Sequence, residues 1–242
     1  MPTRASHTIA CMKWGTKYPA VYANVLYAML SRFLQAPFRL VCFTDDPIGL
    51  EPPIEHRSLP HVPIGEGWPE RGWNKLGMFH PDLGLPAEPT LFLDLDVVIT
   101  GRMEVFFEIP GDFLISNDWD WRKPGVGNSS IFRWIPGTQD HLWQRFRAEP
   151  DVVRKQYRNE QEYVSAEARA MDFWPDALCR SYKRHCLPRG IAKPFFAPKL
   201  PQKARVLIFH GDPKPEDAIA GRSGKWYRRF RPAPWLADYY RL

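Results

Sequence analysis

The chain has 242 residues, of which 44% are hydrophobic and 14% aromatic, and its formal net charge is +6. This composition is globular and excludes an intrinsically disordered chain, while the length allows a sizeable core. The positive charge favours an anionic ligand or surface but is too diffuse to indicate nucleic acid by itself. No run reaches transmembrane length and the first residues lack the apolar core of a signal peptide, so we expect a cytoplasmic location.

The first half of the chain alternates between strand and helix patterns. A short apolar strand is predicted over His7–Met12, a helix over Tyr18–Leu34, and a second strand over Phe38–Thr44. Such a β-α-β unit implies parallel strands with a ligand crevice at their carboxyl ends. The segment Ile48–Pro69 is rich in proline and glycine and is predicted to be a loop.

The second half is less regular. We expect a short helix at Trp73–Phe79 and a strand at Thr90–Ile99. The remaining predicted elements are strands at Phe113–Asn117, Ser130–Trp134 and Val206–His210 and helices at Thr138–Arg147 and Asn159–Ala170. No linker divides the chain, so we predict one domain over 1–242. Within it, 7–100 form a first half, 101–216 a second half that lines the site, and 217–242 a basic-aromatic tail.

Two aspartates, Asp94 and Asp96, interrupt the most hydrophobic stretch of the chain. On a strand, residues i and i+2 project to the same side, so the two carboxylates are expected to point the same way. Two like charges in an apolar setting are costly unless a cation lies between them, and Mg²⁺ or Mn²⁺ suits carboxylate ligands. The alternative is a pair of aspartates at a strand end that accept backbone hydrogen bonds.

Three further places carry polar groups at predicted element ends. His210 ends a strand and Lys214 follows between two prolines, where it is either a neutralising cation or an incidental lysine in a turn. Asn128-Ser129-Ser130 enters a strand, and Glu160-Gln161 opens a helix, where acids also serve the helix dipole.

The four cysteines do not indicate a metal centre. Cys11 and Cys42 lie in apolar runs and are expected to be buried thiols. Cys179 and Cys186 lack the spacing of a zinc site.

In this order, the motifs resemble those of GT-A fold glycosyltransferases, nearest to the family-eight retaining enzymes related to glycogenin and bacterial galactosyltransferases. The matching stretches are Leu91–Ile99, Asn128–Ser130, Glu160-Gln161 and His210–Pro215. The resemblance implies an α/β, Rossmann-like nucleotide-binding fold with a mixed, mostly parallel central sheet and helices on both faces. It also implies the transfer of a hexose from a nucleotide sugar, UDP-linked in this family, to a hydroxyl group of a glycan or lipid-linked acceptor, with retention.

Carried over by position, the resemblance assigns a role to each matching residue. Asp94, Asp96 and His210 would bind Mn²⁺ or Mg²⁺ on the diphosphate, which Lys214 would contact. The residues that would bind the nucleotide or donor are Met12, Lys13, Trp14, Tyr18, Thr44, Asp45, Lys75, Asp94, Leu95 and Asn128. Gln161 would stabilise the opposite face of the sugar, beside Glu160, and Asp118 is a further candidate for contacting sugar hydroxyls.

The chain departs from the family pattern at three positions. The segment between His210 and Lys214 is two residues shorter than in the family, Glu160 replaces an aspartate, and Ser130 replaces a glycine. The metal-binding assignment is therefore firmer than the sugar-contacting one.

The tail interleaves basic and aromatic residues over 225–241. It either lies on an anionic membrane or packs its aromatic rings on the domain.

Two rival functions remain: a haloacid-dehalogenase-type phosphatase that uses Asp94 and Asp96, and a non-catalytic basic module that binds nucleic acid. The first rival normally carries its Asp-x-Asp at the start of the fold, and the second leaves the two aspartates unexplained. We therefore expect no nucleic-acid partner.

Overall fold

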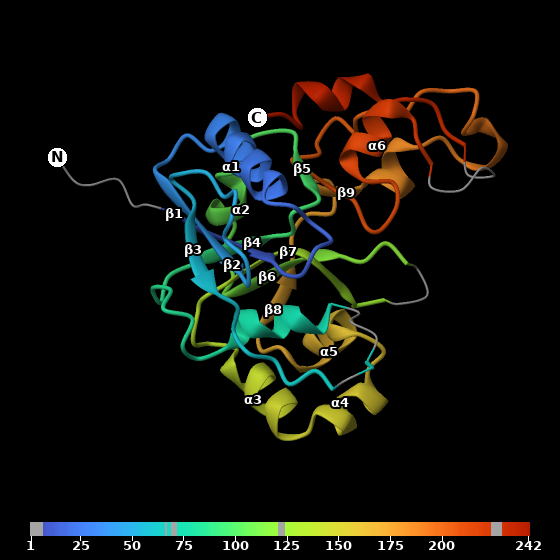
Figure 1. Ribbon diagram of the computed structural model, residues 1–242. Helices are drawn as coiled ribbons and strands as arrows, with labels where there is room; N and C mark the ends of the chain where they lie inside the picture. The colour runs from blue at the N-terminus through green and yellow to red at the C-terminus, as the bar shows by residue number, and fades with distance from the viewer. Residues whose placement is uncertain (1–6, 66, 69–71, 121–123, 224–228) are drawn as a thin grey trace.

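The computed structural model describes residues 7–65, 67–68, 72–120, 124–223 and 229–242. A seven-stranded sheet with the order β3-β2-β1-β4-β7-β6-β8 forms the centre, and a three-stranded sheet with the order β5-β10-β9 adjoins it. Figure 1 shows α1 on one side of the large sheet and α3, α4 and α5 on the other.

The predicted β-α-β unit is confirmed. Strand β1 (His7–Lys13) pairs in parallel with β2 (Phe38–Thr44) and with β4 (Thr90–Leu93), and α1 (Val21–Phe33) connects the first two. The prediction of a loop over 48–69 is wrong at β3 (Glu55–Ser58), which pairs in parallel with β2. This edge strand is mostly exposed and polar, so it lacks the apolar alternation from which strands are predicted.

The other half of the large sheet is antiparallel at its centre. Strand β7 (Gly127–Trp134) runs antiparallel to both β4 and β6 (Phe113–Asn117), while β8 (Met171–Phe173) lies parallel to β6. The sheet is therefore mixed and mostly parallel, as predicted.

The single strand predicted over Thr90–Ile99 is wrong. After β4 the chain turns at Leu95 and Asp96, and β5 (Val97–Ile99) leaves the large sheet to pair antiparallel with β10 (Val206–Ile208). Strand β9 (Cys179–Ser181) pairs in parallel with the other side of β10. Because β5 belongs to the predicted first half and β10 to the second, the two halves share one sheet.

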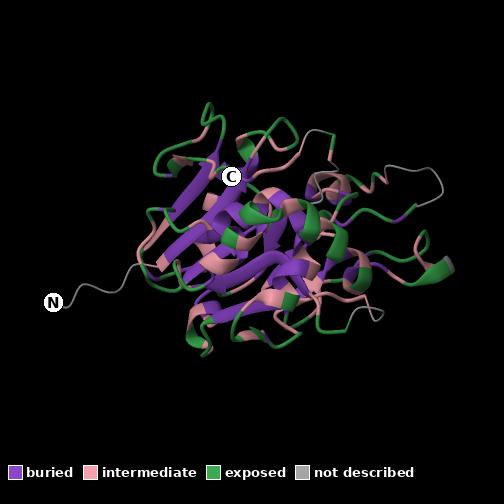
Figure 2. Cartoon of the chain, turned by 90° about the horizontal axis from the view of Figure 1, so that it is seen from below, coloured by how far each residue is buried: buried purple, intermediate pink, exposed green. Residues whose placement is uncertain are grey.

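Helices cover both faces of the large sheet, so there are two apolar cores. Ile9 and Cys11 on β1 face the core that includes α1 and the small sheet, while Ala10 and Met12 face the core that includes the 3₁₀ helix η1 (Trp73–Phe79). Figure 2 shows the strands as the most continuously buried part of the chain. The remaining helices are α2 (Val105–Glu108), α3 (Asp140–Ala148), α4 (Pro150–Gln156), α5 (Glu160–Glu167), a π-helical turn (Tyr182–Cys186), 3₁₀ turns at Gly190–Ala192 and Pro234–Asp238, and α6 (Pro215–Ala220).

The described part of the tail packs on the domain. The rings of Trp235, Tyr239 and Tyr240 contact the core on the α1 side, and Arg32 donates to the carbonyl oxygen of Tyr239. For these aromatic residues the packed alternative holds, while residues 225–228 of the predicted membrane segment lie outside the described residues.

All four cysteines are free and buried. In the described ranges, no helix has both the length and the apolar character needed to cross a bilayer.

A buried arginine connects β7 to α2 and to the segment after it. Arg133 donates to the carbonyl oxygens of Phe106, Ile109 and Gly111 at 2.6, 2.8 and 2.6 Å. Because Arg133→Met leaves these acceptors without their donor, we expect it to lower the free energy of unfolding by about 2–4 kcal/mol in urea denaturation. Arg102→Met, at a residue with a 60% exposed side chain in a surface ion pair, is the control and is expected to cost less than about 1 kcal/mol. Equal losses would contradict the role given to Arg133.

Candidate functional site

The site lies where β1, β2 and β4 end. Asp94 directly follows β4, and its backbone N–H still donates to the Ser130 carbonyl oxygen of β7 at 2.9 Å. Beyond it the chain turns, so the two carboxylates lie at a sheet break and do not alternate along a strand. Buried sheet interiors do not accommodate charged side chains, and the break gives both aspartates polar surroundings.

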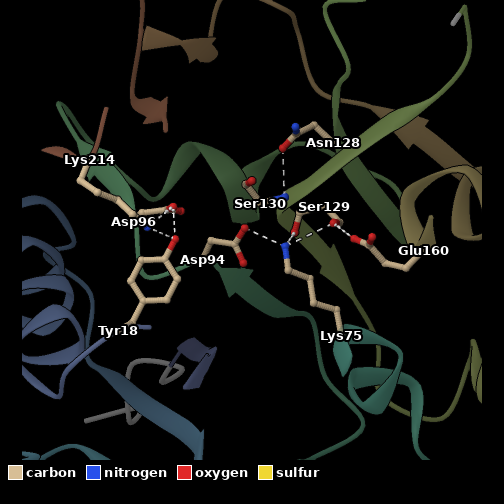
Figure 3. Close-up of polar contacts among 9 residues, drawn as sticks. All are labelled: Tyr18, Lys75, Asp94, Asp96, Asn128, Ser129, Ser130, Glu160 and Lys214. Atoms are coloured by element: carbon tan, nitrogen blue, oxygen red, sulfur yellow. Dashed lines mark hydrogen bonds and ion pairs between the residues drawn. The ribbon is translucent and has the colours of Figure 1, made fainter. Parts of the chain in front are cut away.

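Asp94 is held by a buried lysine. The Lys75 Nζ atom, on η1, lies 2.7 Å from the Asp94 Oδ2 atom and 3.4 Å from both oxygens of Ser129 (Figure 3). The Ser129 hydroxyl donates to the Glu160 carboxylate at the start of α5. Burial lowers the pKa of Lys75, but the charges of Asp94 and Glu160 outweigh it and raise the pKa above its usual value. Lys75 therefore stays charged between two acidic groups.

Asp96 faces a second lysine. The Tyr18 hydroxyl donates to the Asp96 Oδ2 atom at 2.5 Å, and the Lys214 Nζ atom lies 3.5 Å from the same oxygen. Lys214 also bonds the Tyr18 hydroxyl and lies 3.6 Å from the centre of its ring. Burial and then the negative charge of Asp94 raise the pKa of Asp96, while Tyr18 and Lys214 oppose this rise. The two carboxylates thus repel each other and each has its own ammonium group.

The ends of β1 and β2 are joined by a polar turn. The Lys13 Nζ atom donates to the Asp46 carbonyl oxygen at 2.8 Å, and the Gly15 N–H donates to the Asp45 carboxylate at 2.9 Å. The Thr44 hydroxyl donates to the Asp46 carbonyl oxygen and accepts from the Asp46 N–H. This places Lys13, Thr44 and Asp45 together at the carboxyl edge, as the resemblance implies.

His210 contacts Ser181, Trp119 and Lys183. Its Nε2 atom lies 2.7 Å from the Ser181 hydroxyl oxygen, its ring stacks on Trp119, and its carbonyl oxygen accepts from Lys183. Burial and then the charge of Lys183 lower the pKa of His210 to about 4, so the ring is neutral at physiological pH. Asp118 lies close enough to oppose this lowering.

The described residues hold no group of three or more His, Cys, Asp or Glu side chains able to bind a metal ion. The predicted set of Asp94, Asp96 and His210 is therefore not assembled. The two aspartates by themselves suit a divalent cation, because such an ion would relieve the repulsion that raises the pKa of Asp96. The role of His210 as a third ligand stays a prediction.

The other predicted residues lie around this centre. Asn128 is buried on β7 and accepts from the Ser130 N–H at 3.0 Å, and Gln161 is the second residue of α5. Leu95 and Met12 are buried core residues, and Trp14 packs against the η1 core. Figure 3 shows Tyr18, Asp96 and Lys214 on one side of Asp94, and Lys75, Asn128 and Glu160 on the other.

Three contributing residues were not predicted, and a fourth, Ser129, was named only as part of the segment Asn128–Ser130. Ser129 contacts both Lys75 and Glu160. The Asp46 carbonyl oxygen accepts a hydrogen bond from Lys13, and the Ser181 hydroxyl is hydrogen-bonded to His210. Glu216 accepts from Tyr22 and ties α6 to α1. Only the adjacency of Asp46 to Asp45 and of Ser129 to Asn128 gave any signal in the sequence, since the other contacts join distant segments.

Comparison with known proteins gives matches in structure only, since neither a family profile nor a curated protein matches the sequence. The glycosyltransferase GlyE of Streptococcus pneumoniae TIGR4, in its apo form, matches with a TM-score of 0.60 at 13% identity, over 98% of this chain and 61% of GlyE. The galactosyltransferase LgtC, in complex with donor and acceptor sugar analogs, matches with a TM-score of 0.56 at 12% identity, over 86% of this chain and 88% of LgtC. This chain has the GT-A fold.

The match to LgtC and GlyE confirms the predicted resemblance and the predicted fold class. An active-site mutant of LgtC matches similarly, with a TM-score of 0.57 at 11% identity. The chain spans about three fifths of the length of GlyE (61%) and most of the length of LgtC. At these identities the likeness establishes the architecture alone.

The pairing of Lys75 with Asp94 is a largely buried ion pair, with side chains 10% and 18% exposed. Lys75→Met leaves Asp94 and Glu160 uncompensated, so we expect the free energy of unfolding to fall by about 3–5 kcal/mol in urea denaturation.

The double variant Lys75→Met/Asp94→Asn removes both charges of the pair and is expected to recover part of this loss. Lys155→Met, at an exposed residue on α4, is the matched control and is expected to change stability by less than about 0.5 kcal/mol. A double variant no more stable than Lys75→Met would contradict the pairing.

Proposed function

We propose that this protein is a metal-dependent glycosyltransferase that moves a hexose from a nucleotide sugar, UDP-linked, to a hydroxyl acceptor with retention. One observation carries the proposal: two carboxylates and two ammonium groups converge at the carboxyl edge of the parallel strands in a GT-A fold. Ligands of open α/β sheets bind at that edge. The structure of LgtC with donor and acceptor sugar analogs is consistent with this choice.

The nucleotide is assigned to the turn that joins β1 and β2. Lys13 supplies a cation there, with a side chain that is largely buried, and Thr44 and Asp45 supply hydrogen-bonding groups for a base or ribose. Tyr18 at the entrance to α1 connects this region to Asp96. The diphosphate then extends from the β1 edge toward Asp96 and Lys214.

Breaking the anomeric bond leaves new negative charge on the nucleoside diphosphate. Asp94 and Asp96 would hold a Mn²⁺ or Mg²⁺ ion, which supplies positive charge to the leaving diphosphate when bound. Lys214 contributes a further positive charge beside Asp96, in a half-buried position where water screens it less than on the surface. Lys75 keeps the Asp94 carboxylate in place by bonding its Oδ2 atom.

The sugar is assigned to the side of the site formed by β7 and α5. Asn128 and Gln161 are amides able to bond sugar hydroxyls, and Gln161 would stabilise positive charge on the far face of the ring. Glu160 is buried and bonded to Ser129, and burial raises its pKa. It therefore positions Lys75 and Ser129 and does not face the sugar. In a retaining reaction a phosphate oxygen takes the acceptor proton, so no protein base is assigned.

The rival functions fit the structure less well. A haloacid-dehalogenase phosphatase carries its Asp-x-Asp after the first strand of its fold, whereas here it follows β4 of a GT-A fold. A nucleic-acid module based on the tail needs exposed aromatic rings, and Trp235 and Tyr239 pack on the core. Neither rival explains the paired lysines at Asp94 and Asp96.

The first experiment is calorimetric titration with UDP, GDP and CDP, each with Mn²⁺ and with a chelator. We expect UDP to bind with Mn²⁺ and to lose at least about ten-fold in affinity with the chelator, because the carboxylates can then no longer engage the diphosphate through a cation. Asp96→Asn is expected to abolish the effect of Mn²⁺, whereas Asp151→Asn, at an exposed residue on α4, leaves it unchanged. If no nucleotide binds the wild-type protein, the proposal fails.

A second experiment separates sugar contacts from nucleotide contacts. Gln161→Ala removes an amide assigned to the sugar, so we expect the rate of UDP-hexose hydrolysis, measured as UDP release, to fall by about 10²-fold. The affinity for UDP is expected to stay at the wild-type value. A variant that loses UDP affinity and rate in proportion would contradict this division of roles.

A further inference from the structure

A basic pocket lies next to the proposed transfer site. It has a volume of about 420 Å³ and is lined by Trp119 and by residues between 183 and 193. Its basic lining residues are Lys183, Arg184, His185, Arg189 and Lys193. None of the described lining residues is acidic. The Asp176 carboxylate accepts from the Trp119 indole and pairs with Arg180.

The charges of the pocket act on its surroundings. Burial is the main cause of the lowered pKa values of His185 and His210, and the charge of Arg184 adds to both. The basic side chains around the pocket make a further cation unfavourable there and favour an anion. Arginine and lysine side chains at the rim suit phosphate oxygens in particular.

The pocket adjoins the transfer site through His210. The Trp119 ring stacks on His210 at 6.5 Å and meets His185 edge-on at 5.5 Å. Lys183 donates to the His210 carbonyl oxygen at the end of β10, four residues before Lys214. The pocket therefore lies beside the segment that carries His210 and Lys214.

Two exposed aromatic residues follow the pocket directly. Phe195 and Phe196 are 72% and 65% exposed and come two and three residues after Lys193. Their backbone N–H groups both donate to the Ala192 carbonyl oxygen, so a compact turn presents the two rings beside the basic rim. Aromatic rings beside basic residues favour the interface of an anionic membrane.

From these observations we infer that the basic pocket receives the phosphate of a lipid-borne acceptor while Phe195 and Phe196 lie in the membrane interface. This inference rests on the proposed glycosyl transfer and names the chemical class of its acceptor. A soluble phosphorylated sugar would use the pocket but not the two rings. Single-stranded nucleic acid would need an extended basic and aromatic track, whereas the pocket is a compact concavity with one aromatic wall.

The test is flotation of the whole protein with vesicles of phosphatidylcholine alone or with added phosphatidylglycerol. Wild-type protein is expected to float only with the anionic vesicles. Arg184→Gln/Lys193→Gln is expected to weaken partition by roughly five-fold per removed charge. Phe195→Ser/Phe196→Ser is expected to weaken it by at least about ten-fold, because two rings stay in water. The control variant Val152→Ser/Lys155→Gln removes an exposed apolar residue and an exposed lysine from α4, at the opposite end from β9 (Figure 1), and is expected to bind like wild type.

A competition arm separates a phosphate pocket from diffuse attraction. Inorganic pyrophosphate is expected to release the wild-type protein from anionic vesicles more effectively than sodium chloride of equal ionic strength, and to lose this advantage with Arg184→Gln/Lys193→Gln. Equal release by the two salts overturns the inference. So do wild-type flotation of the pocket variant, equal flotation with neutral vesicles, and preferential binding to a single-stranded oligonucleotide.

Binding of UDP in the presence of Mn²⁺, measured on every variant, keeps the two proposals distinct. Variants that bind UDP like wild type are folded, so their loss of flotation reports on the membrane surface. Absence of UDP binding by the wild-type protein rejects the proposed function, whereas UDP binding without flotation rejects only the lipid-borne acceptor.

Discussion

The turn at Asp94–Asp96 is the constraint on which the rest of the structure depends. Up to Leu93 the chain is a buried strand of the large sheet, and from Val97 it is a buried strand of the small one. The two carboxylates lie where the chain passes from the large sheet to the small one. Each is neutralised by a lysine from a separate segment. The same feature therefore joins the two sheets and concentrates charge at one edge.

The electrostatic balance at this edge explains why distant segments converge there. Lys75 comes from η1, Lys214 from the turn after β10, and Glu160 from the start of α5. Buried charges persist only when they are paired and hydrogen-bonded, so these segments are held together by the requirement to compensate Asp94 and Asp96. A donor diphosphate would enter a region where cations and anions are already closely matched.

Much of the fold was predictable from local patterns. Strands β2 and β6 were predicted with the observed bounds, because each is a short apolar run between turns. Strand β3 was missed because its exposed edge has no apolar face. The break after Leu93 was missed because Val97–Ile99 continues the apolar pattern while changing partners, and pairing partners leave no trace in local composition.

The site was predictable only in part. Asp94 and Asp96 stand out as charges within an apolar run, but the roles of Lys75 and Lys214 followed from resemblance and position along the chain. The direction of the His210 ring depends on Ser181, which is 29 residues away, and no local pattern indicates that contact. The basic pocket was missed for the same reason, since Trp119 joins it from another part of the chain.

The contact between Tyr18 and Lys214 joins residues 196 positions apart. During synthesis Tyr18 leaves the ribosome long before Lys214. Strands β1 and β4 and helix α1 are therefore outside the ribosome while Asp96 still lacks its lysine partner. The edge formed by β1 and β2 can form early. The charge balance around Asp96 is completed only when the segment before α6, which carries Lys214, has left the ribosome. The charge balance of the proposed site therefore depends on a contact that spans most of the 242 residues.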